Sequence, residues 1–155
     1  MKKKPFHFSL RARRILIALR TALITAPEDL QITDCDDQLI LRCEMLVREF
    51  PKLFRLGFVM GIYLFDRISI LFGSGFRRFI HLNIEKRKRY VEKWLTSSRP
   101  FLRDIFTGLR GIIMVSYFSH QDVWRYIGYD PKAHALERKT LREKLMRDKE
   151  NTAQT

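Results

Sequence analysis

Histidine and cysteine are the side chains best suited to hold a metal or to activate a nucleophile. The two cysteines, Cys35 and Cys43, lie in one predicted helix with α-carbons about 12 Å apart, too far for a disulfide. No Cys-x-x-Cys motif is present, and no two histidines have the spacing that presents two imidazoles on one helix turn. We therefore expect small buried thiols and surface or capping histidines. The four histidines are His7, His81, His120 and His134.

Serine and aspartate offer two further places for chemistry. Ser97 and Ser98 have no neighbouring histidine in the sequence to activate them, and the chain contains no Gly-x-Ser-x-Gly elbow. Paired carboxylates occur at Asp34, Asp36 and Asp37, close to a predicted helix start, where capping is a sufficient explanation. The sequence therefore predicts that this chain alone builds no catalytic site.

Charge and composition narrow the class of protein. The chain has 155 residues, enough for one domain with a single core. Thirty Lys and Arg against 17 Asp and Glu give a formal charge of +13, which indicates an acidic partner, a nucleic acid or an anionic membrane face. Twelve Phe, 5 Tyr and 2 Trp supply bulky packing material, which is typical of a folded domain.

The first 27 residues carry seven basic side chains and no acidic one. Arg13 and Arg14 precede an apolar run at 15–26, an arrangement that resembles a twin-arginine export signal, but Arg20 interrupts the run. The alternative is an amphipathic packing helix, which we favour. Its predicted apolar face consists of Leu10, Leu16, Leu19 and Leu23.

The segment from Leu53 to Phe65 is apolar on nearly every face of a helix, so it must be covered on all sides. Arg55, Asp66 and Arg67 keep the uncharged run below the roughly 20 residues that a bilayer requires. We expect a central core helix or a helix that docks on a partner.

Capping signals mark several helix starts. Thr33 with Asp36, and Ser119 with Asp122, have capping-box spacing, and Asn83 is a predicted N-cap. The second box opens a short helix, after which Gly128 is expected to adopt the left-handed conformation that ends it.

Pro100 is placed to occupy the first turn of a longer helix, in which Gly108 and Gly111 permit close approach of another element. Apolar residues recur along it at three- and four-residue spacing, so we expect it to be buried. This stripe consists of Leu102, Ile105, Leu109, Ile112 and Val115.

Beyond Pro131 charge dominates, which predicts a solvated tail helix that frays toward Thr155. No segment shows the strict alternation of a half-buried strand. The predicted fold is all-α, a single bundle of about six helices. Its parts are a basic N-terminal arm at 1–8, a helical domain at 9–131 and a charged tail helix at 132–155.

Two groups of motifs lie between Phe79 and Pro131: Phe79-Ile80-His81-Leu82 with Trp94-Leu95-Thr96-Ser97-Ser98, and Tyr117-Phe118-Ser119-His120 with Val123-Trp124-Arg125-Tyr126-Ile127-Gly128-Tyr129. In residue types and spacing this stretch resembles the helical segment that precedes the flavin domain of long-chain fatty alcohol oxidases. It is also similar to small helical subunits related to gluconate dehydrogenase subunit three, which accompany flavoproteins of the glucose–methanol–choline family.

The resemblance implies a non-catalytic accessory subunit whose partner is a large flavoprotein oxidoreductase. FAD, the catalytic histidine and the substrate pocket are then expected on that partner, and this chain is expected to bind no cofactor. The surplus of Phe, Leu and Met suits a lipophilic alcohol or a membrane-surface contact. The weak twin-arginine pattern favours a location in the cytoplasm or at the periphery of the inner membrane over the periplasm.

A chain with this much aromatic area is also expected to bury surface against a partner on physical grounds. The alternative is that the same aromatic residues only fill the core of the monomer. The candidate interface residues are Phe58, Tyr63, Phe65, Trp94, Trp124 and Tyr129.

A basic adaptor is the alternative function. The basic arm and the cluster at 86–89 have the charge to contact an anionic membrane or nucleic-acid phosphates. Each candidate helix, however, carries its aromatic residues on the apolar side and offers no short polar side chains for reading bases, so nucleic acid is the less favoured partner.

Overall fold

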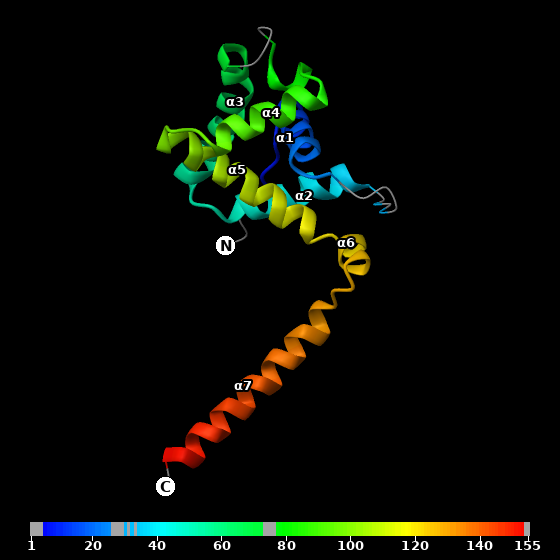
Figure 1. Cartoon of the computed structure of the whole chain (residues 1–155), viewed down its shortest axis with the longest axis vertical. Coiled ribbons are helices and arrows are strands. Elements are labelled where there is room, and N and C mark those ends of the chain that lie inside the picture. Colours follow the sequence, from blue (N-terminus) through cyan, green and yellow to red (C-terminus); the bar gives the residue numbers. More distant parts are fainter. Residues whose placement is uncertain (1–4, 26–29, 31, 33, 73–76, 154–155) are drawn as a thin grey trace.

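The structure is a computed structural model that describes residues 5–25, 30, 32, 34–72 and 77–153. Within these ranges it contains helices and no strand, so the predicted all-α class is confirmed, with seven α-helices where about six were expected. Helices α1 to α5 form the body, and α7 runs away from it (Figure 1). The elements are α1 (Leu10–Leu23), α2 (Cys35–Glu49), α3 (Lys52–Phe72), a 3-10 helix η1 (Phe79–His81), α4 (Ile84–Leu95), α5 (Pro100–Phe118), α6 (Gln121–Tyr126) and α7 (Pro131–Ala153).

Helix α1 lies in the core and contacts α2, α3, η1, α4 and α5. It begins at Ser9, whose hydroxyl accepts a hydrogen bond from the Ala12 N–H at 3.2 Å. Leu16 and Leu19 are fully buried, as the packing-helix interpretation predicts. Leu10 is exposed, contrary to expectation, because six residues at 100° each place it on another face from Leu16.

The buried carboxylate of Glu44 on α2 holds the start of α1. It accepts hydrogen bonds from the Phe8 N–H at 2.9 Å and from the Arg13 guanidinium at 2.9 Å, and it lies 2.8 Å from His7 Nδ1. Burial raises the pKa of Glu44, but these hydrogen bonds and the Arg13 charge outweigh it, so the pKa lies below its ordinary value of 4.5.

A second buried carboxylate, Asp66 on α3, also anchors α1. Its Oδ2 accepts a hydrogen bond from Arg11 at 2.8 Å, and its Oδ1 accepts one from the Ile80 N–H at 3.4 Å. The buried Ser69 hydroxyl lies one turn further along α3, 2.8 Å from the Asp66 carbonyl and 3.0 Å from the Arg77 carbonyl. Helix α3 therefore directs polar side chains inward.

Aromatic rings fill the core where α3, η1, α4 and α5 meet. The ring of Phe65 is central, with centroids of four other rings within 6 Å of its own: Phe79 at 4.7 Å, Tyr90 and Trp94 at 5.1 Å, and Phe106 at 5.7 Å. The Tyr90 hydroxyl donates to the Phe65 carbonyl at 2.7 Å, and burial raises the Tyr90 pKa. Edge-to-face and offset ring contacts add to the free energy of burial.

Three of the predicted helix ends are confirmed. The Asn83 side chain accepts from the Lys86 N–H at 3.0 Å, and Pro100 occupies the first turn of α5. Gly128 has a φ of 67°, the left-handed conformation expected after the short helix α6.

The capping box at Ser119 is wrong. The N-cap of α6 is His120, whose ring Nδ1 accepts from the Asp122 N–H at 3.2 Å. Ser119 still ends α5, and its hydroxyl donates to the Val115 carbonyl in the preceding turn. At the start of α2, Asp34 is left-handed and makes no side-chain cap, while Thr33 lies outside the described residues.

The cysteines both lie in α2 and both are free. The buried Cys43 thiol lies 3.2 Å from the Ser116 hydroxyl, and burial raises its pKa to about 11. Cys35 is partly buried, and burial raises its pKa as well. Thiols with raised pKa values carry little thiolate near neutral pH, which agrees with the expected packing role of Cys43.

The predicted arm and tail lie at opposite ends of the chain. Lys2, Lys3 and Lys4 are outside the described residues, whereas Phe8 is buried against the body. In α7 the side chains at 132–147 are all exposed, and Thr155 is outside the described part. None of the described helices has the length and the uninterrupted apolar run needed to span a membrane.

Candidate interaction surface

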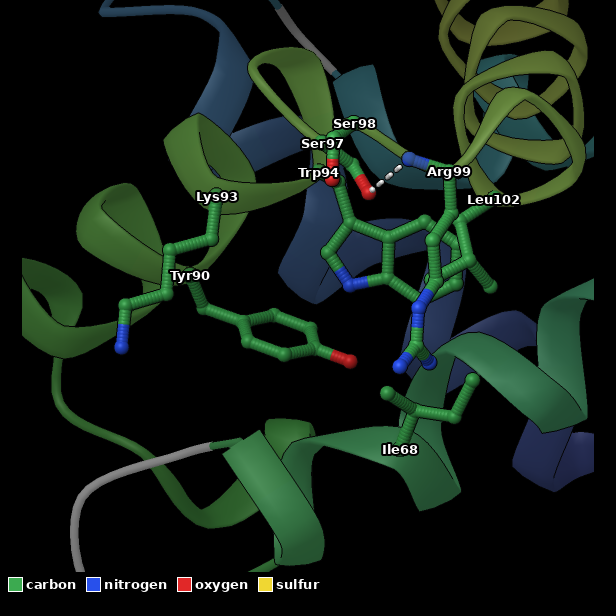
Figure 2. Close-up of a pocket in the computed structure, with 8 residues that line it drawn as sticks. All are labelled: Ile68, Tyr90, Lys93, Trp94, Ser97, Ser98, Arg99 and Leu102. Carbon is green, nitrogen blue, oxygen red and sulfur yellow. Dashed lines mark hydrogen bonds between the residues drawn. The ribbon is translucent and has the colours of Figure 1, made fainter.

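Metal sites in proteins are built from His, Cys, Asp and Glu side chains that lie close together. Among the described residues, His, Cys, Asp and Glu nowhere gather in a group of three that could hold a metal ion. A hollow of about 240 Å³ lies beside α4. Figure 2 shows the Tyr90 ring between the side chains of Lys93 and Arg99, with the Trp94 ring close to Arg99. Ser97 Oγ accepts a hydrogen bond from the Arg99 N–H at 3.3 Å there.

Two hydroxyl groups of this hollow, those of Tyr90 and Ser97, already form hydrogen bonds within the fold. The Tyr90 hydroxyl is bonded to the Phe65 carbonyl, and Ser97 shapes the turn between α4 and α5. Tyr90 and Trp94 are both buried members of the aromatic core. The hollow is therefore a surface depression over that core. A larger groove lies between α3 and α5.

The outward face of α3 is apolar. Leu53 is 77% exposed, Met60 59% and Leu71 78%. Together with Gly57, Leu64 and Arg67 these residues follow one another at alternating spacings of four and three, the heptad repeat of a helix that packs along a second helix. We call residues 53, 57, 60, 64, 67 and 71 the α3 seam; Arg67 is its one charged member.

The outward face of α5 repeats this pattern. Phe101 is 66% exposed and Val115 55%. With Ile105, Gly108 and Ile112 they also follow spacings of four and three, and we call these five residues the α5 seam. The prediction that this stripe is buried is wrong for Val115, because the buried face of α5 is the neighbouring one. That face carries Phe106, Leu109, Ile113, Ser116 and Tyr117.

The first part of each seam lines one groove: Leu53, Gly57, Met60 and Leu64 of the α3 seam, and Phe101, Ile105 and Gly108 of the α5 seam. Helices α3 and α5 pack against each other, with Gly61 of α3 beside Ile105 of α5. Between them is a groove of about 680 Å³, hereafter the α3/α5 groove. Its walls include Leu53, Phe54, Met60 and Leu64 from α3 and Phe101 and Ile105 from α5. Among the described residues that line it, only Asp104 is charged.

Glycines widen this groove. A methyl group added at Gly57, Gly108 or Gly111 would meet no other atom within 4 Å, so no neighbour in the described fold requires a glycine there. Gly61 differs, because a methyl group there would lie 3.2 Å from Ile105. A glycine inside a helix costs about 1 kcal/mol relative to alanine, and at three positions nothing in the described fold offsets that cost.

Four of the predicted interface residues lie in or against the core. Phe65 and Trp94 are buried in the aromatic cluster, as the core alternative predicts. Phe58 is partly buried between Phe8 and Phe50, although it also lines the α3/α5 groove. The hydroxyls of Tyr63 and Ser9 are 2.6 Å apart, which ties α3 to the start of α1.

The other two predicted residues lie at the α6 turn. Trp124 is partly buried and donates its indole N–H to the Phe118 carbonyl at 2.6 Å. Tyr129 is half exposed, with its ring edge-to-face against Trp124 at 6.1 Å. The structure therefore places the six residues in separate regions and does not assemble them into one surface.

The sequence pointed to residues 53–65 as a core helix or a docking helix, but the interface residues predicted from that segment were Phe58, Tyr63 and Phe65. The most exposed apolar side chains of the groove, Leu53, Phe54 and Phe101, were not among the predicted interface residues. The seam spacing was the available signal, because a second apolar heptad on a helix that already has a buried face indicates a second packing surface.

Much of the basic charge of α1 is internally neutralised. Arg11 pairs with Asp66 and Arg13 with Glu44, and Arg20 forms a short ion pair with Asp36. These three guanidinium groups therefore contribute less to the outer surface than the formal charge of +13 suggests. The exposed part of α4 retains Lys86, Lys88 and Arg89.

Known proteins give no further guide to this surface. No family model, no curated protein and no solved structure matches the chain.

Proposed function

We propose that this chain is a non-catalytic accessory subunit that binds and stabilises a flavin-dependent alcohol dehydrogenase or oxidase of the glucose–methanol–choline family. FAD and the reacting groups belong to that partner, and the substrate is a lipophilic alcohol. The observation that carries the proposal is the apolar α3/α5 groove, whose walls expose Leu53, Phe54 and Phe101 to water.

The size and shape of this face favour a permanent partner. Large contiguous apolar patches on soluble domains mark interaction sites, and obligate interfaces are the more apolar class. The motifs between Phe79 and Pro131 supply the family of the partner, through their resemblance to helical companions of flavoproteins.

Co-expression tests the proposal. The full chain, with an affinity tag, is produced together with a glucose–methanol–choline flavoprotein encoded beside it, and the complex is purified and examined by size exclusion and flavin absorbance. We expect both polypeptides in one yellow peak, and a lower soluble yield when the chain is produced alone, because the groove is then uncovered.

An unrelated flavoprotein of similar size is the control for non-specific capture. A monodisperse, soluble chain that purifies without the flavoprotein under the same conditions would contradict the proposal. The assembled complex should lose little turnover per flavin when Trp124 is changed to Ala, since no proton or hydride passes through this side chain.

A basic adaptor is the second candidate, favoured by the exposed Lys86, Lys88 and Arg89 on α4. Side chains of this kind contribute about 1 kcal/mol each near an anionic lipid surface. Vesicles containing phosphatidylserine should capture the full chain if this role holds, and charge reversal at these three positions should abolish capture. Steeply salt-dependent binding to duplex DNA would instead favour the nucleic-acid version.

A further inference from the structure

Helices α3 and α5 form the walls of an apolar groove that none of the described helices fills. Along it, residues 53, 57, 60 and 64 of α3 and residues 101, 105 and 108 of α5 keep heptad spacing. We infer that the α3/α5 groove receives one amphipathic α-helix of the flavoprotein, with apolar residues at heptad spacing and a Lys or Arg facing Asp104. This inference rests on the proposed function and names the element of the partner that binds.

The shape of the groove suits a helix of the partner better than a flat surface of the partner. The part of the α3 seam that lines the groove, from Leu53 to Leu64, advances by 11 residues, which is three helical turns or about 17 Å. Side chains repeating every 3.5 residues match another helix with the same repeat, as in peptide helices that dock into grooves. Gly57 and Gly108 leave open space where a methyl group would stand, so the backbone of the incoming helix can approach closely.

The described tail helix lacks the pattern needed to fill this groove. Its large apolar residues scatter around the helix axis, because each residue advances the direction by 100° and the spacings between them are five, four and one. These residues are Leu136, Leu141, Leu145 and Met146, all exposed.

Charge distinguishes a protein helix from a polyanion. In a chain with 30 Lys and Arg, none of the described residues that line the groove is basic, and Asp104 is a carboxylate. Anionic lipid headgroups and nucleic-acid phosphates would be repelled by Asp104, whereas a Lys or Arg on an incoming helix would pair with it. One such pair also fixes the register of a helix in a groove whose other described lining residues are uncharged.

Site-specific crosslinking identifies the occupant. A photo-crosslinking benzophenone amino acid replaces Met60 in the full chain, which is co-expressed with the flavoprotein, irradiated and analysed by mass spectrometry. The same replacement at Leu145 on α7 is the matched control, because Leu145 is also an exposed apolar residue. We expect a crosslink from position 60 to a helical segment of the flavoprotein with heptad spacing, and none from position 145.

Two crosslinking results would overturn the inference. A crosslink from position 60 to a second copy of this chain would make the groove a homodimer face. A yellow complex that forms normally but crosslinks only from position 145 would place the interface elsewhere and leave the proposed function standing.

A designed peptide tests the groove even if no flavoprotein binds. The probe is an amphipathic helix of about three heptads, with Leu at the apolar positions and one Lys, and its twin carries Glu in place of that Lys. Titrated against the full chain, the Lys peptide should bind about tenfold more tightly than its twin. The Asp104→Lys variant should reverse this preference, while the nearby Arg103→Glu variant should leave its sign unchanged.

The peptide result separates the two proposals. Binding with the preference reversed by Asp104→Lys supports the groove even when the flavoprotein fails to co-purify, in which case only the proposed function falls. Equal binding of both peptides, or none, would overturn the inferred helix site.

Discussion

Two regions of this chain are equally rich in bulky apolar side chains, yet only one of them is covered. In the aromatic core, Phe65, Trp94 and Phe106 are buried against one another. In the α3/α5 groove, Leu53 and Phe101 are of similar bulk and face water. Helix α3 contributes to both regions, since Phe65 points inward from the same helix that carries Leu53 outward.

The difference lies in where α3 places its polar residues. Asp66 and Ser69 are fully buried on the inward face, satisfied by Arg11, Ile80 and Arg77, while the outward seam is apolar apart from Arg67. A helix that only filled a monomer core would show the reverse arrangement. Apolar content alone therefore does not locate an interface, whereas buried polar residues on one helix face with an apolar heptad on the opposite face do.

Truncation of one large side chain in each region should separate them most strongly. Phe65→Ala should lower the free energy of unfolding by about 3–5 kcal/mol, because a fully buried ring leaves a cavity. Met60→Ala should change it by about 0.5 kcal/mol or less, since Met60 is exposed. Urea unfolding followed by circular dichroism measures both, and equal losses would show that the groove is closed in solution.

In the buried body of the protein, Glu44→Gln should lower the free energy of unfolding by about 1–2 kcal/mol, which is less than the loss expected for Phe65→Ala. The substitution removes the negative charge opposite Arg13 and weakens a buried set of hydrogen bonds, although Arg13 and His7 are partly exposed and can turn to water. Unfolding of Glu44→Gln beside wild type at pH 7 measures the loss, and Glu92→Gln, on the exposed face of α4, is the control.

The stabilising contribution of the Glu44 carboxylate should also appear in the way stability depends on pH. Because the folded pKa of Glu44 lies below its ordinary value of 4.5, its contribution is fully present above about pH 4.5 and is lost as the pH falls through the lower folded value. Wild-type thermal stability should therefore fall in acid below that pH, and Glu44→Gln should fall less steeply. An identical acid slope in both would contradict the role given to Glu44.

A smaller effect is expected at the turn before α7. Gly128 has a φ of 67°, and a residue with a β-carbon costs roughly 1–2 kcal/mol in that conformation. Gly128→Val should therefore loosen the junction of α6 and α7 with little change in the body, because α7 lies outside it (Figure 1). Hydrogen exchange should become faster at 121–135 and stay constant in α1, and faster exchange throughout would make α6 part of the core unit.

The smallest expected effect is that of Gly108→Ala, which should stabilise the free chain and weaken its association with the flavoprotein. Gly108→Ala should stabilise the free chain by about 0.5–1 kcal/mol, since alanine is the better helix former and the added methyl group meets open space. The same methyl group should weaken association with the flavoprotein. Thermal unfolding and co-purification yield measure the two effects. A variant that is more stable and binds as well as wild type would show that the partner does not use the open space at Gly108.

The helical class and several helix ends were predictable from local chemistry. Asn83 as a cap, Pro100 in a first turn and Gly128 as a left-handed stop each depend on residues within one turn. The first segment as a packing helix followed from its leucine spacing, with Leu16 and Leu19 buried. His120 displaced Ser119 as a cap because an imidazole one residue later also reaches the N–H groups of the first turn.

The choice of outward face was not predictable from single helices. Spacing alone allowed Val115 to be core, and it is the arrangement of α2, α3 and α5 that turns Phe106 and Ile113 inward. The inward role of Asp66 depends on Arg11, 55 residues away in the sequence. Long-range pairs of this kind decide which of two apolar stripes is covered.

Hydrogen–deuterium exchange of the full chain, free and in the co-purified flavoprotein complex, shows whether the α3/α5 groove is the docking surface. If the α3/α5 groove receives a partner helix, amides at 53–64 and 101–115 should exchange more slowly in the complex. Those of α4 at 84–95, on the aromatic side of the body, should then change little. Slower exchange confined to α4 or α7, with the two groove segments unchanged, would contradict the assignment of this groove as the docking surface.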